Sequence, residues 1–159
     1  ITGKNKSSGT IGVNFNHALA YVTVNFDGED VITLSNAKLN GTYQSGTYTV
    51  TYGSPTSVVW TSQDDAEDLD LNEGKLTSNY TTSFLVVPED NNDASNTISF
   101  NYTIEGMTGS PISKSIDLSE TWAAGKHYIY NVSIGANEIK FEVTTVNGWD
   151  DDEIPTVIQ

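Results

Sequence analysis

The sequence predicts an all-β domain in which two antiparallel sheets pack face to face as a β-sandwich. Apolar and polar residues alternate in segment after segment, and Gly, Asn, Asp, Ser or Pro separates these segments. The eight Tyr and the many Thr suit pleated surfaces. The absence of helical crossovers from this pattern favours an antiparallel sandwich over a parallel α/β fold. Ig-like and transthyretin-like sandwiches fit this two-layer architecture, and a closed barrel is the alternative.

The clearest strands in the first third of the chain cover residues 18–26 and 47–52. Every second residue in both segments is apolar, which places the apolar side chains on one face of a pleated strand. These apolar positions are Val22, Val24, Phe26, Tyr48, Val50 and Tyr52. We therefore expect two half-buried antiparallel strands.

Two further regions show the same alternation nearer the C-terminus. Residues 97–104 form one strand, and residues 128–134 and 139–143 form a hairpin around the break at 135–137. Combining these strands, we expect one core lined by Val22, Val24, Phe26, Tyr48, Val50, Phe100, Tyr102, Tyr130, Val132, Phe141 and Val143.

Shorter strands are expected at residues 31–34, 57–61 and 112–118, which brings the total to eight or nine. Residues 84–87 are continuously apolar, a pattern typical of a strand covered on both faces. Residues 64–76 lean weakly toward a helix, but they are too acidic and too poorly periodic to form one. We expect a loop there.

A chain of 159 residues matches the size of one domain. The strand pattern places the β-sandwich at residues 11–153. Residues 1–10 then form a leading segment, and residues 154–159 form a C-terminal tail or edge strand.

The charge of the chain excludes two classes of partner. Its 21 acidic residues and 7 basic residues, all Lys, give a net charge of −14. This charge repels nucleic acid and anionic membrane surfaces. No apolar run approaches the roughly 20 residues of a transmembrane helix, so we expect no membrane insertion. The chain has no Cys, which excludes disulfides and thiolate chemistry.

Histidine and carboxylate chemistry is poorly supported. The two histidines, His17 and His127, fall on the strand faces opposite the apolar residues, so we expect both at a surface or an edge. Most acids lie in solvated runs such as 64–65 and 150–153, where nothing raises a carboxyl pKa. We predict no enzyme, no catalytic residue, no cofactor and no metal. A glycan hydrolase using two carboxylates is the least favoured alternative.

Two acidic segments leave a weak calcium site open. Residues 68–74 begin like a calcium-binding loop, but the Gly is one place late and Asn79 stands where a Glu is required. Residues 89–93 form a second cluster of loop oxygens. Because a charge run is usually a solvated loop, our prediction remains that no metal binds.

Aromatic residues and glycosylation sequons are weaker signals. Trp60, Trp122 and Trp149 could form a sugar-stacking platform, although core packing is their more common role. The five Asn-x-Ser/Thr sequons begin at Asn5, Asn40, Asn79, Asn101 and Asn131. A chain rich in Asn and Thr produces such sequons by chance, so they do not establish glycosylation.

Two stretches resemble one family. Residues 13–24 contain Phe15-Asn16-His17-Ala18-Leu19 and then an alternating strand, with Tyr21 where a basic residue is expected. Residues 122–132 contain Gly125-Lys126-His127-Tyr128-Ile129-Tyr130, and a closing Trp149 follows. These motifs resemble the fimbrillin-like (Mfa-like) family of pilus subunits and surface lipoproteins from anaerobic Gram-negative bacteria. The resemblance spans about residues 11–152.

The resemblance implies a structural or adhesive domain of a cell-surface fimbria, and this family carries no catalytic residues. It also implies a C-terminal domain, with a signal peptide, a lipidated cysteine and a first domain before Ile1. The expected location is the cell surface, anchored at the outer membrane in the full-length protein. The expected partners are other pilus subunits joined by strand addition, and also surface glycans or proteins. The alternative is a carbohydrate-binding domain of a surface lipoprotein, which requires two Trp on one exposed face.

Overall fold

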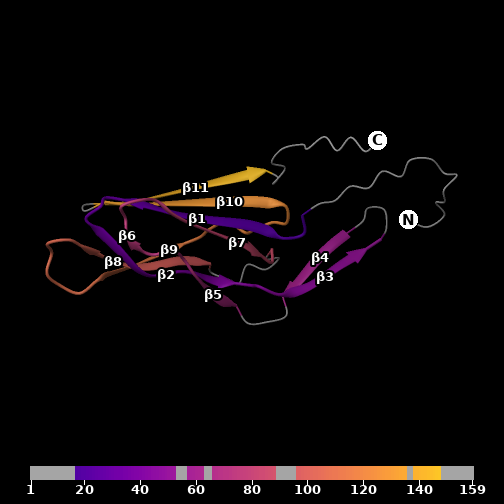
Figure 1. The fold of residues 1–159 in the computed structure, drawn as a ribbon. Coiled ribbons are helices and arrows are strands. Elements are labelled where there is room, and N and C mark those ends of the chain that lie inside the picture. The colour runs from indigo at the N-terminus through magenta and orange to yellow at the C-terminus, as the bar shows by residue number, and fades with distance from the viewer. Residues whose placement is uncertain (1–16, 53–56, 63–65, 89–95, 136–137, 148–159) are drawn as a thin grey trace, which may run out of the picture.

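The computed structural model describes residues 17–52, 57–62, 66–88, 96–135 and 138–147, and all of their regular structure is β (Figure 1). The strands are β1 (Ala20–Gly28), β2 (Ile32–Thr42), β3 (Gly46–Thr51), β4 (Ser57–Ser62), β5 (Glu67–Asp70), β6 (Gly74–Lys75), β7 (Tyr80–Val86), β8 (Thr97–Ile104), β9 (Ile112–Asp117), β10 (Lys126–Ile134) and β11 (Ile139–Asn147).

The first sheet has the strand order β11-β10-β1-β7. Its central pair, β1 and β10, is parallel, with Val22 opposite Tyr128 and Val24 opposite Tyr130. The two outer pairs are antiparallel. The closing hairpin predicted from the alternation on either side of residues 135–137 is confirmed by the pairing of β10 with β11.

The second sheet has the order β5-β2-β8-β9, and the short β6 also pairs with β2. All of its pairs are antiparallel. The register between β2 and β8 shifts between Ser35 and Lys38. Asn36, inside this irregularity, has a positive φ of 50°, a left-handed conformation that Asn tolerates better than most residues. The long strand β2 pairs with three strands, β5, β6 and β8.

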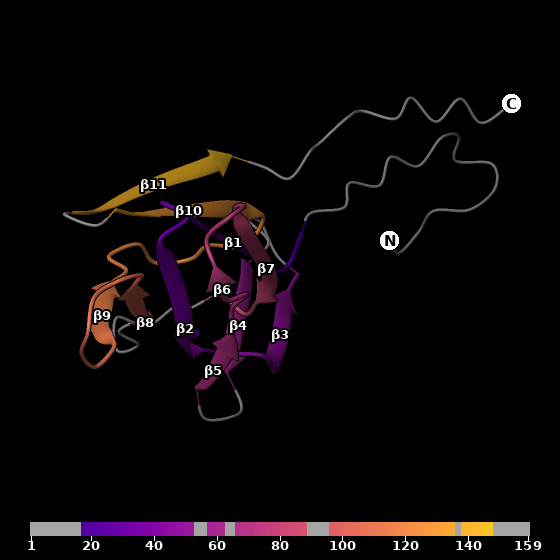
Figure 2. The same cartoon turned by 60° about the vertical axis from the view of Figure 1, so that its left-hand side comes forward.

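The core lies between these two sheets, which Figure 2 shows as separate layers with β10 and β11 above β2, β8 and β9. Phe26 of one sheet meets Phe100 of the other edge to face, with ring centroids 5.3 Å apart. Most of the predicted core positions are buried, as the alternation requires. They are Val22, Val24, Phe26, Phe100, Tyr102, Tyr130 and Val132, with Phe141 and Val143 packed at the margin.

The predicted sandwich is confirmed, and none of the described sheets closes into a barrel. The parallel pair of β1 and β10 is the one departure from antiparallel pairing in the described residues. The structure describes none of residues 1–10 or 154–159, so the proposed leading segment and tail lie outside the described residues.

Four predictions were wrong. Tyr48 and Val50 do not line the core, because β3 and β4 form a separate two-stranded sheet. Residues 64–76 are not entirely a loop, since β5 and β6 pair there with β2. Leu85 is exposed, so β7 is not covered on both faces. The described residues form eleven strands, and eight or nine were expected.

Candidate functional site

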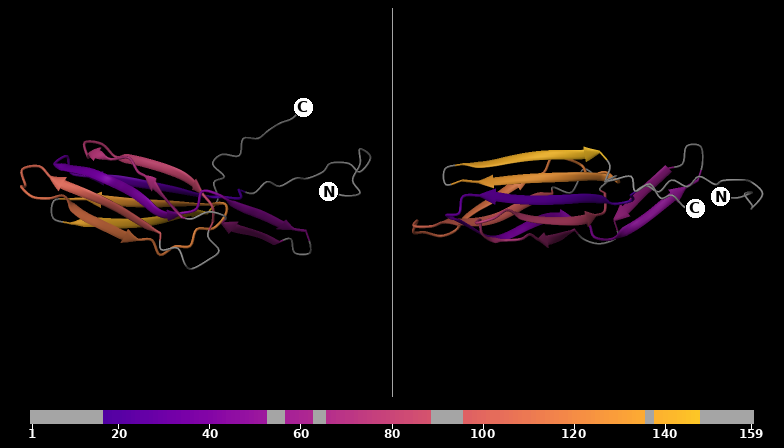
Figure 3. Two further views of the ribbon diagram at one scale, coloured as in Figure 1. Left: turned by 90° about the horizontal axis from the view of Figure 1, so that it is seen from below. Right: turned by 45° about the horizontal axis from the view of Figure 1, so that its top comes forward.

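The hairpin of β3 and β4 reaches past one end of the sandwich, as both views in Figure 3 show. Its register places Tyr48 opposite Trp60 and Val50 opposite Val58. Because directly opposed residues share a face, these four side chains form one apolar face of the hairpin. The other face carries Thr49 opposite Val59, flanked by further hydroxyl residues.

Exposed apolar surface is concentrated on this hairpin. Seven large hydrophobic residues are exposed in the described chain, and four of them lie on the hairpin or directly after β3: Tyr48, Tyr52, Val58 and Val59. Residues 39–63 contain no Asp, Glu or Lys, although the chain has a net charge of −14. Exposed aromatic residues in a region without charged side chains are typical of the centre of a protein interface.

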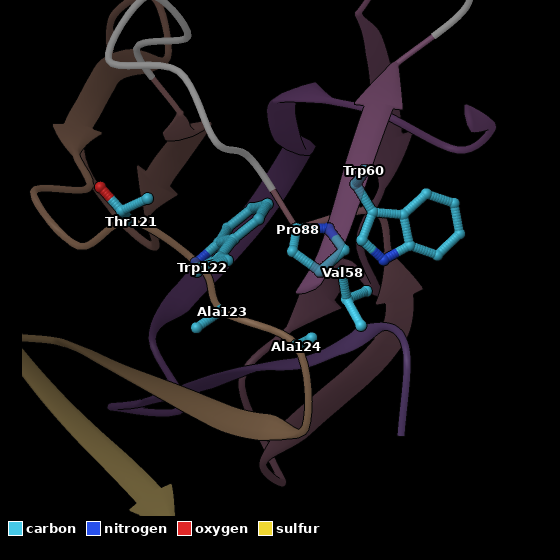
Figure 4. A pocket seen from close by; sticks show the side chains of 7 residues that line it. All are labelled: Val58, Trp60, Pro88, Thr121, Trp122, Ala123 and Ala124. Carbon is cyan, nitrogen blue, oxygen red and sulfur yellow. The ribbon is translucent and has the colours of Figure 1, made fainter. Parts of the chain in front are cut away.

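A pocket of about 300 Å³ lies between the hairpin and the end of the sandwich. Figure 4 shows Trp122 on one side and Trp60 on the other, with Pro88 and Val58 between them. The remaining lining residues are Thr121, Ala123 and Ala124. Most of these side chains are apolar, so the pocket favours an apolar occupant.

The segment just before β1 is held against the same hairpin. The Trp60 indole Nε1 donates a hydrogen bond to the Ala18 carbonyl oxygen at 2.6 Å. The Trp60 ring also lies 5.0 Å from the Tyr48 ring, centroid to centroid. Trp60 therefore links the apolar face of the hairpin to the segment that enters the first sheet.

Sheet edges are a second candidate surface. In the described part of the chain, β11 and β7 flank the first sheet, and β9 is an edge of the second. An edge strand has backbone N–H and C=O groups that another strand can pair. On β11 the inward-facing residues Ile139, Phe141 and Val143 are only partly buried. A strand added beside β11 would cover them.

The other two edges carry features that oppose such addition. On β9, Lys114 stands opposite the buried Phe100 and so points toward the interior side of the sheet. An inward-pointing charge on an edge strand discourages pairing. On β7, the Asn72 side chain donates to the Thr81 carbonyl oxygen at 2.8 Å, and its backbone N–H donates to the Thr82 hydroxyl at 2.9 Å. Asn72 thus occupies part of this edge.

A row of polar side chains crosses the outer face of the first sheet. The Asn25 amide donates to the Asn131 side-chain oxygen at 2.9 Å, and the Thr81 hydroxyl donates to the Asn25 side-chain oxygen at 2.8 Å. This row ties together the three strands β10, β1 and β7. Asn131 begins one of the sequons, and its side chain is part of this row.

The two histidines lie outside the core. His17 is exposed, as predicted. His127 is half-buried on the outer face of β10, where its Nε2 shares a hydrogen bond with the Thr23 hydroxyl at 2.9 Å. Its ring lies 4.4 Å from that of Tyr21. The expectation of a surface or edge position therefore holds for His127 as a surface position, since β10 itself lies between β11 and β1 and is not an edge strand.

Residues 68–74 gather no metal site, and nowhere in the described residues could three His, Asp or Glu side chains hold a metal ion together. In residues 68–74, Asp70 pairs with Lys38 at 2.9 Å and Glu73 accepts a hydrogen bond from the Ala37 backbone N–H at 3.1 Å. Residues 89–93 lie outside the described residues, so the prediction for that segment stays open.

The three tryptophans do not share one exposed face. Trp122 is only 1% exposed and Trp60 is partly buried. Trp149 lies outside the described residues. A stacking platform can therefore draw on Trp60 and Trp149 at most. In the described part of the chain, no helix is long and apolar enough to cross a membrane.

The family model described as fimbrillin-like matches residues 2–149. The chain belongs to the fimbrillin-like family. The resemblance carried by the Phe-x-His-Ala-Leu and Gly-x-x-Tyr-x-Tyr motifs is thereby confirmed. The comparison with curated proteins gave no match.

Solved structures similar to this fimbrillin-like chain include cell adhesion and fimbrial proteins. A candidate cell adhesion protein from Bacteroides uniformis is 17% identical, with a TM-score of 0.54 over 91% of this chain and 56% of that one. A candidate cell adhesion protein from Bacteroides ovatus is 10% identical, with a TM-score of 0.49 over 86% and 47%. The tip fimbrial protein Mfa3 of Porphyromonas gingivalis is 11% identical, with a TM-score of 0.46 over 83% and 52%. The chain spans about half the length of these structures.

Sequence reasoning did not identify the hairpin surface of this fimbrillin-like domain. The alternation at Tyr48 and Val50 was recognised, but it was attributed to the core. The available signal was the uncharged segment 39–63 in a chain that is otherwise rich in acidic residues. A neutral stretch with alternating apolar residues indicates either a core strand or an interface, and only the sheet order distinguishes the two.

Proposed function

We propose that this chain is a non-catalytic structural domain of a fimbrial subunit at the cell surface, and that subunits join by strand addition. Membership of the fimbrillin-like family over residues 2–149 is the observation that carries the proposal. The open sandwich edges give it a physical basis, because an extended segment from another subunit can pair with them.

The edge that best suits an incoming strand is β11. Its inward-facing Phe141 stacks on Tyr130, with ring centroids 6.0 Å apart, yet remains only partly buried. An added strand would cover Phe141 and its neighbours Ile139 and Val143, and burial of apolar area contributes roughly 25 cal/mol per Å². The Lys114 charge on β9 and the Asn72 contacts on β7 make those edges poorer acceptors.

Residues 154–159 are the proposed donor strand. Ile154, Thr156 and Ile158 alternate with Pro155, Val157 and Gln159, and a Pro is tolerated in an edge strand. This segment lies outside the described residues. The competing possibility is that the segment pairs within its own domain or frays, as many termini do.

We also propose a place for the domain in the whole protein. It would be the C-terminal domain of a two-domain subunit whose N-terminal lipid anchors it at the outer membrane. The chain spans 56% of the solved Bacteroides uniformis structure, which supports a subunit with one further domain. Surface glycans or proteins are further partners that the adhesive alternative would require.

The test compares the full-length protein with and without residues 154–159. We expect denaturant-resistant ladders and large light-scattering species only from the intact protein, while this domain alone stays monomeric. Phe141→Glu on the β11 edge should also weaken assembly, and Ile112→Glu on the β9 edge serves as its matched control. Identical polymers from the intact and shortened proteins would exclude the tail as the joint.

A further inference from the structure

A two-stranded hairpin is at best marginally stable in water, and it needs a third strand or a packed layer on its apolar face. The hairpin of β3 and β4 pairs with no other strand in the described residues. On its apolar face Tyr48 is 41% exposed and Val58 is 47% exposed. The pocket beside Val58 and Trp60 also remains open to an apolar side chain. This apolar face therefore needs a further segment packed against it.

The part of the chain nearest to this apolar face is the segment just before β1. The Trp60 indole donates a hydrogen bond to the Ala18 carbonyl oxygen at 2.6 Å, so residue 18, one place from the N-terminal limit of the described residues, lies against the hairpin. An extended chain advances about 3.3–3.6 Å per residue, so Phe15 can reach roughly 10 Å from Ala18. That reach includes the rings of Trp60 and Tyr48, which lie 5.0 Å apart.

The segment 11–16 has the pattern that such a cover requires. Ile11, Val13 and Phe15 are apolar, and the residues between them are Gly12 and Asn14. This period of two places the apolar side chains on one side of an extended segment. Residues 7–16 contain no charged side chain, and neither do residues 39–63. Bringing the two segments together therefore adds no like-charge repulsion in a chain of net charge −14.

We propose that residues 11–16 of the same chain lie extended on the apolar face of the hairpin, with alternate side chains packed on Tyr48, Val58 and Trp60. The tether at Ala18 makes this docking intramolecular, and a short linker corresponds to an effective concentration in the millimolar range. A second copy must instead associate from solution against the repulsion of two like-charged chains. The proposal does not depend on the fimbrial function, because it concerns contacts within one chain.

Engineered disulfides test the contact directly, because the chain has no Cys of its own. Two cysteines bridge when their Cα atoms lie about 4.4–6.8 Å apart. We expect Phe15→Cys or Val13→Cys, each combined with Val58→Cys or Tyr48→Cys, to include a pair that oxidises to an intramolecular disulfide. Non-reducing gels and a mass loss of two hydrogens report it.

Two matched controls accompany these pairs. Asn14→Cys with Val58→Cys places the cysteine on the other side of the extended segment. Phe15→Cys with Val59→Cys places the second cysteine on the opposite face of the hairpin. Both should cross-link at least about fivefold more slowly than the best test pair. Equal rates in test and control pairs would overturn the proposal. Cross-linked dimers in place of monomers would show that a second copy is the occupant, which also overturns it.

Hydrogen exchange gives an independent measurement without cysteines. Val13→Ser combined with Phe15→Ser should speed amide exchange in residues 46–51 and 57–62 at least tenfold and leave β8 unchanged. Asn14→Ser should have no such effect. Unchanged exchange in the hairpin of the double variant would contradict the proposal, as would hairpin protection in the wild type that rises with protein concentration.

Discussion

Trp122 shows how single side chains organise the end of the sandwich next to the hairpin. Its indole Nε1 donates to the Tyr130 hydroxyl at 2.8 Å, deep in the core. The Tyr128 hydroxyl donates to the Thr121 carbonyl oxygen at 3.1 Å and accepts from the Ala123 backbone N–H at 2.9 Å. Two tyrosines of β10 thus hydrogen-bond polar groups of Thr121, Trp122 and Ala123, which lets Trp122 be buried.

Tyr130 should make stability fall at alkaline pH. Burial raises the pKa of its hydroxyl, while the unfolded chain keeps an ordinary pKa near 10. The resulting stability is fully present below about pH 10 and is lost as pH rises further, by at most about 1.4 kcal/mol per pH unit. Tyr130→Phe should lose less stability than the wild type between pH 8 and 11 in urea unfolding. At pH 8 the variant should be about 1–3 kcal/mol less stable, because Trp122 loses its acceptor. Equal slopes of stability against pH in the wild type and in Tyr130→Phe would show that Tyr130 is not the source of the alkaline loss.

Gly28 is required for space at the end of β1. An added Cβ would lie 2.5 Å from the Ile134 carbonyl oxygen and 2.7 Å from Leu76 Cδ1. Since the first of these neighbours is backbone, Gly28→Ala should destabilise the domain by about 1–3 kcal/mol in urea unfolding. Gly135→Ala is the control, because its nearest neighbour is the movable Glu29 carboxylate at 3.2 Å. A neutral Gly28→Ala would refute the steric argument.

At the scale of elements, the parallel pairing of β1 with β10 brings together the two asparagines of the polar row on the outer face of the sheet. Asn25 and Asn131 stand directly opposite each other, and their amide groups are hydrogen-bonded at 2.9 Å. Thr81 extends the row to β7 through its bond to Asn25. These side-chain bonds stabilise the register of strands that lie far apart in the sequence.

A double-mutant cycle measures the contribution of this row. Asn25→Ala and Asn131→Ala should each destabilise the domain, and the double variant should lose less than their sum. The expected coupling is about 0.5–1.5 kcal/mol, the usual net value of a hydrogen bond. The Asn40 and Asn131 pair, on different sheets, is the control and should give additive losses. Additivity for Asn25 and Asn131 would mean that the row contributes nothing to pairing.

At the scale of the whole molecule, the net negative charge does not by itself imply that the described residues bind a cation. Asp70 and Glu73 already have partners, so residues 68–74 offer few free ligands. Ca²⁺ prefers six to eight oxygen ligands at short range. We therefore expect a chelator to leave the thermal midpoint unchanged within error. A drop of several degrees after chelation would reveal a real site and would point to residues 89–93.

The local pattern of the sequence determined most of the strands and their inward sides. Side chains alternate across any strand, so Val22, Phe100 and Tyr130 could be assigned to the core without knowing their partners. The two motifs also indicated the fimbrillin-like family before any fold was known. The absence of a sulfur-based site likewise follows from composition alone, because the chain has no Cys.

Only the tertiary structure decided what covers each apolar face. Residues 47–52 alternate as clearly as 97–104, yet β8 lies inside a sheet while β3 lies in a separate hairpin. Periodicity shows that one side of a strand is apolar, but coverage depends on contacts between residues far apart in the chain. The same reason explains β5 and β6, which form because β2 offers them an edge, and the parallel register of β1 on β10.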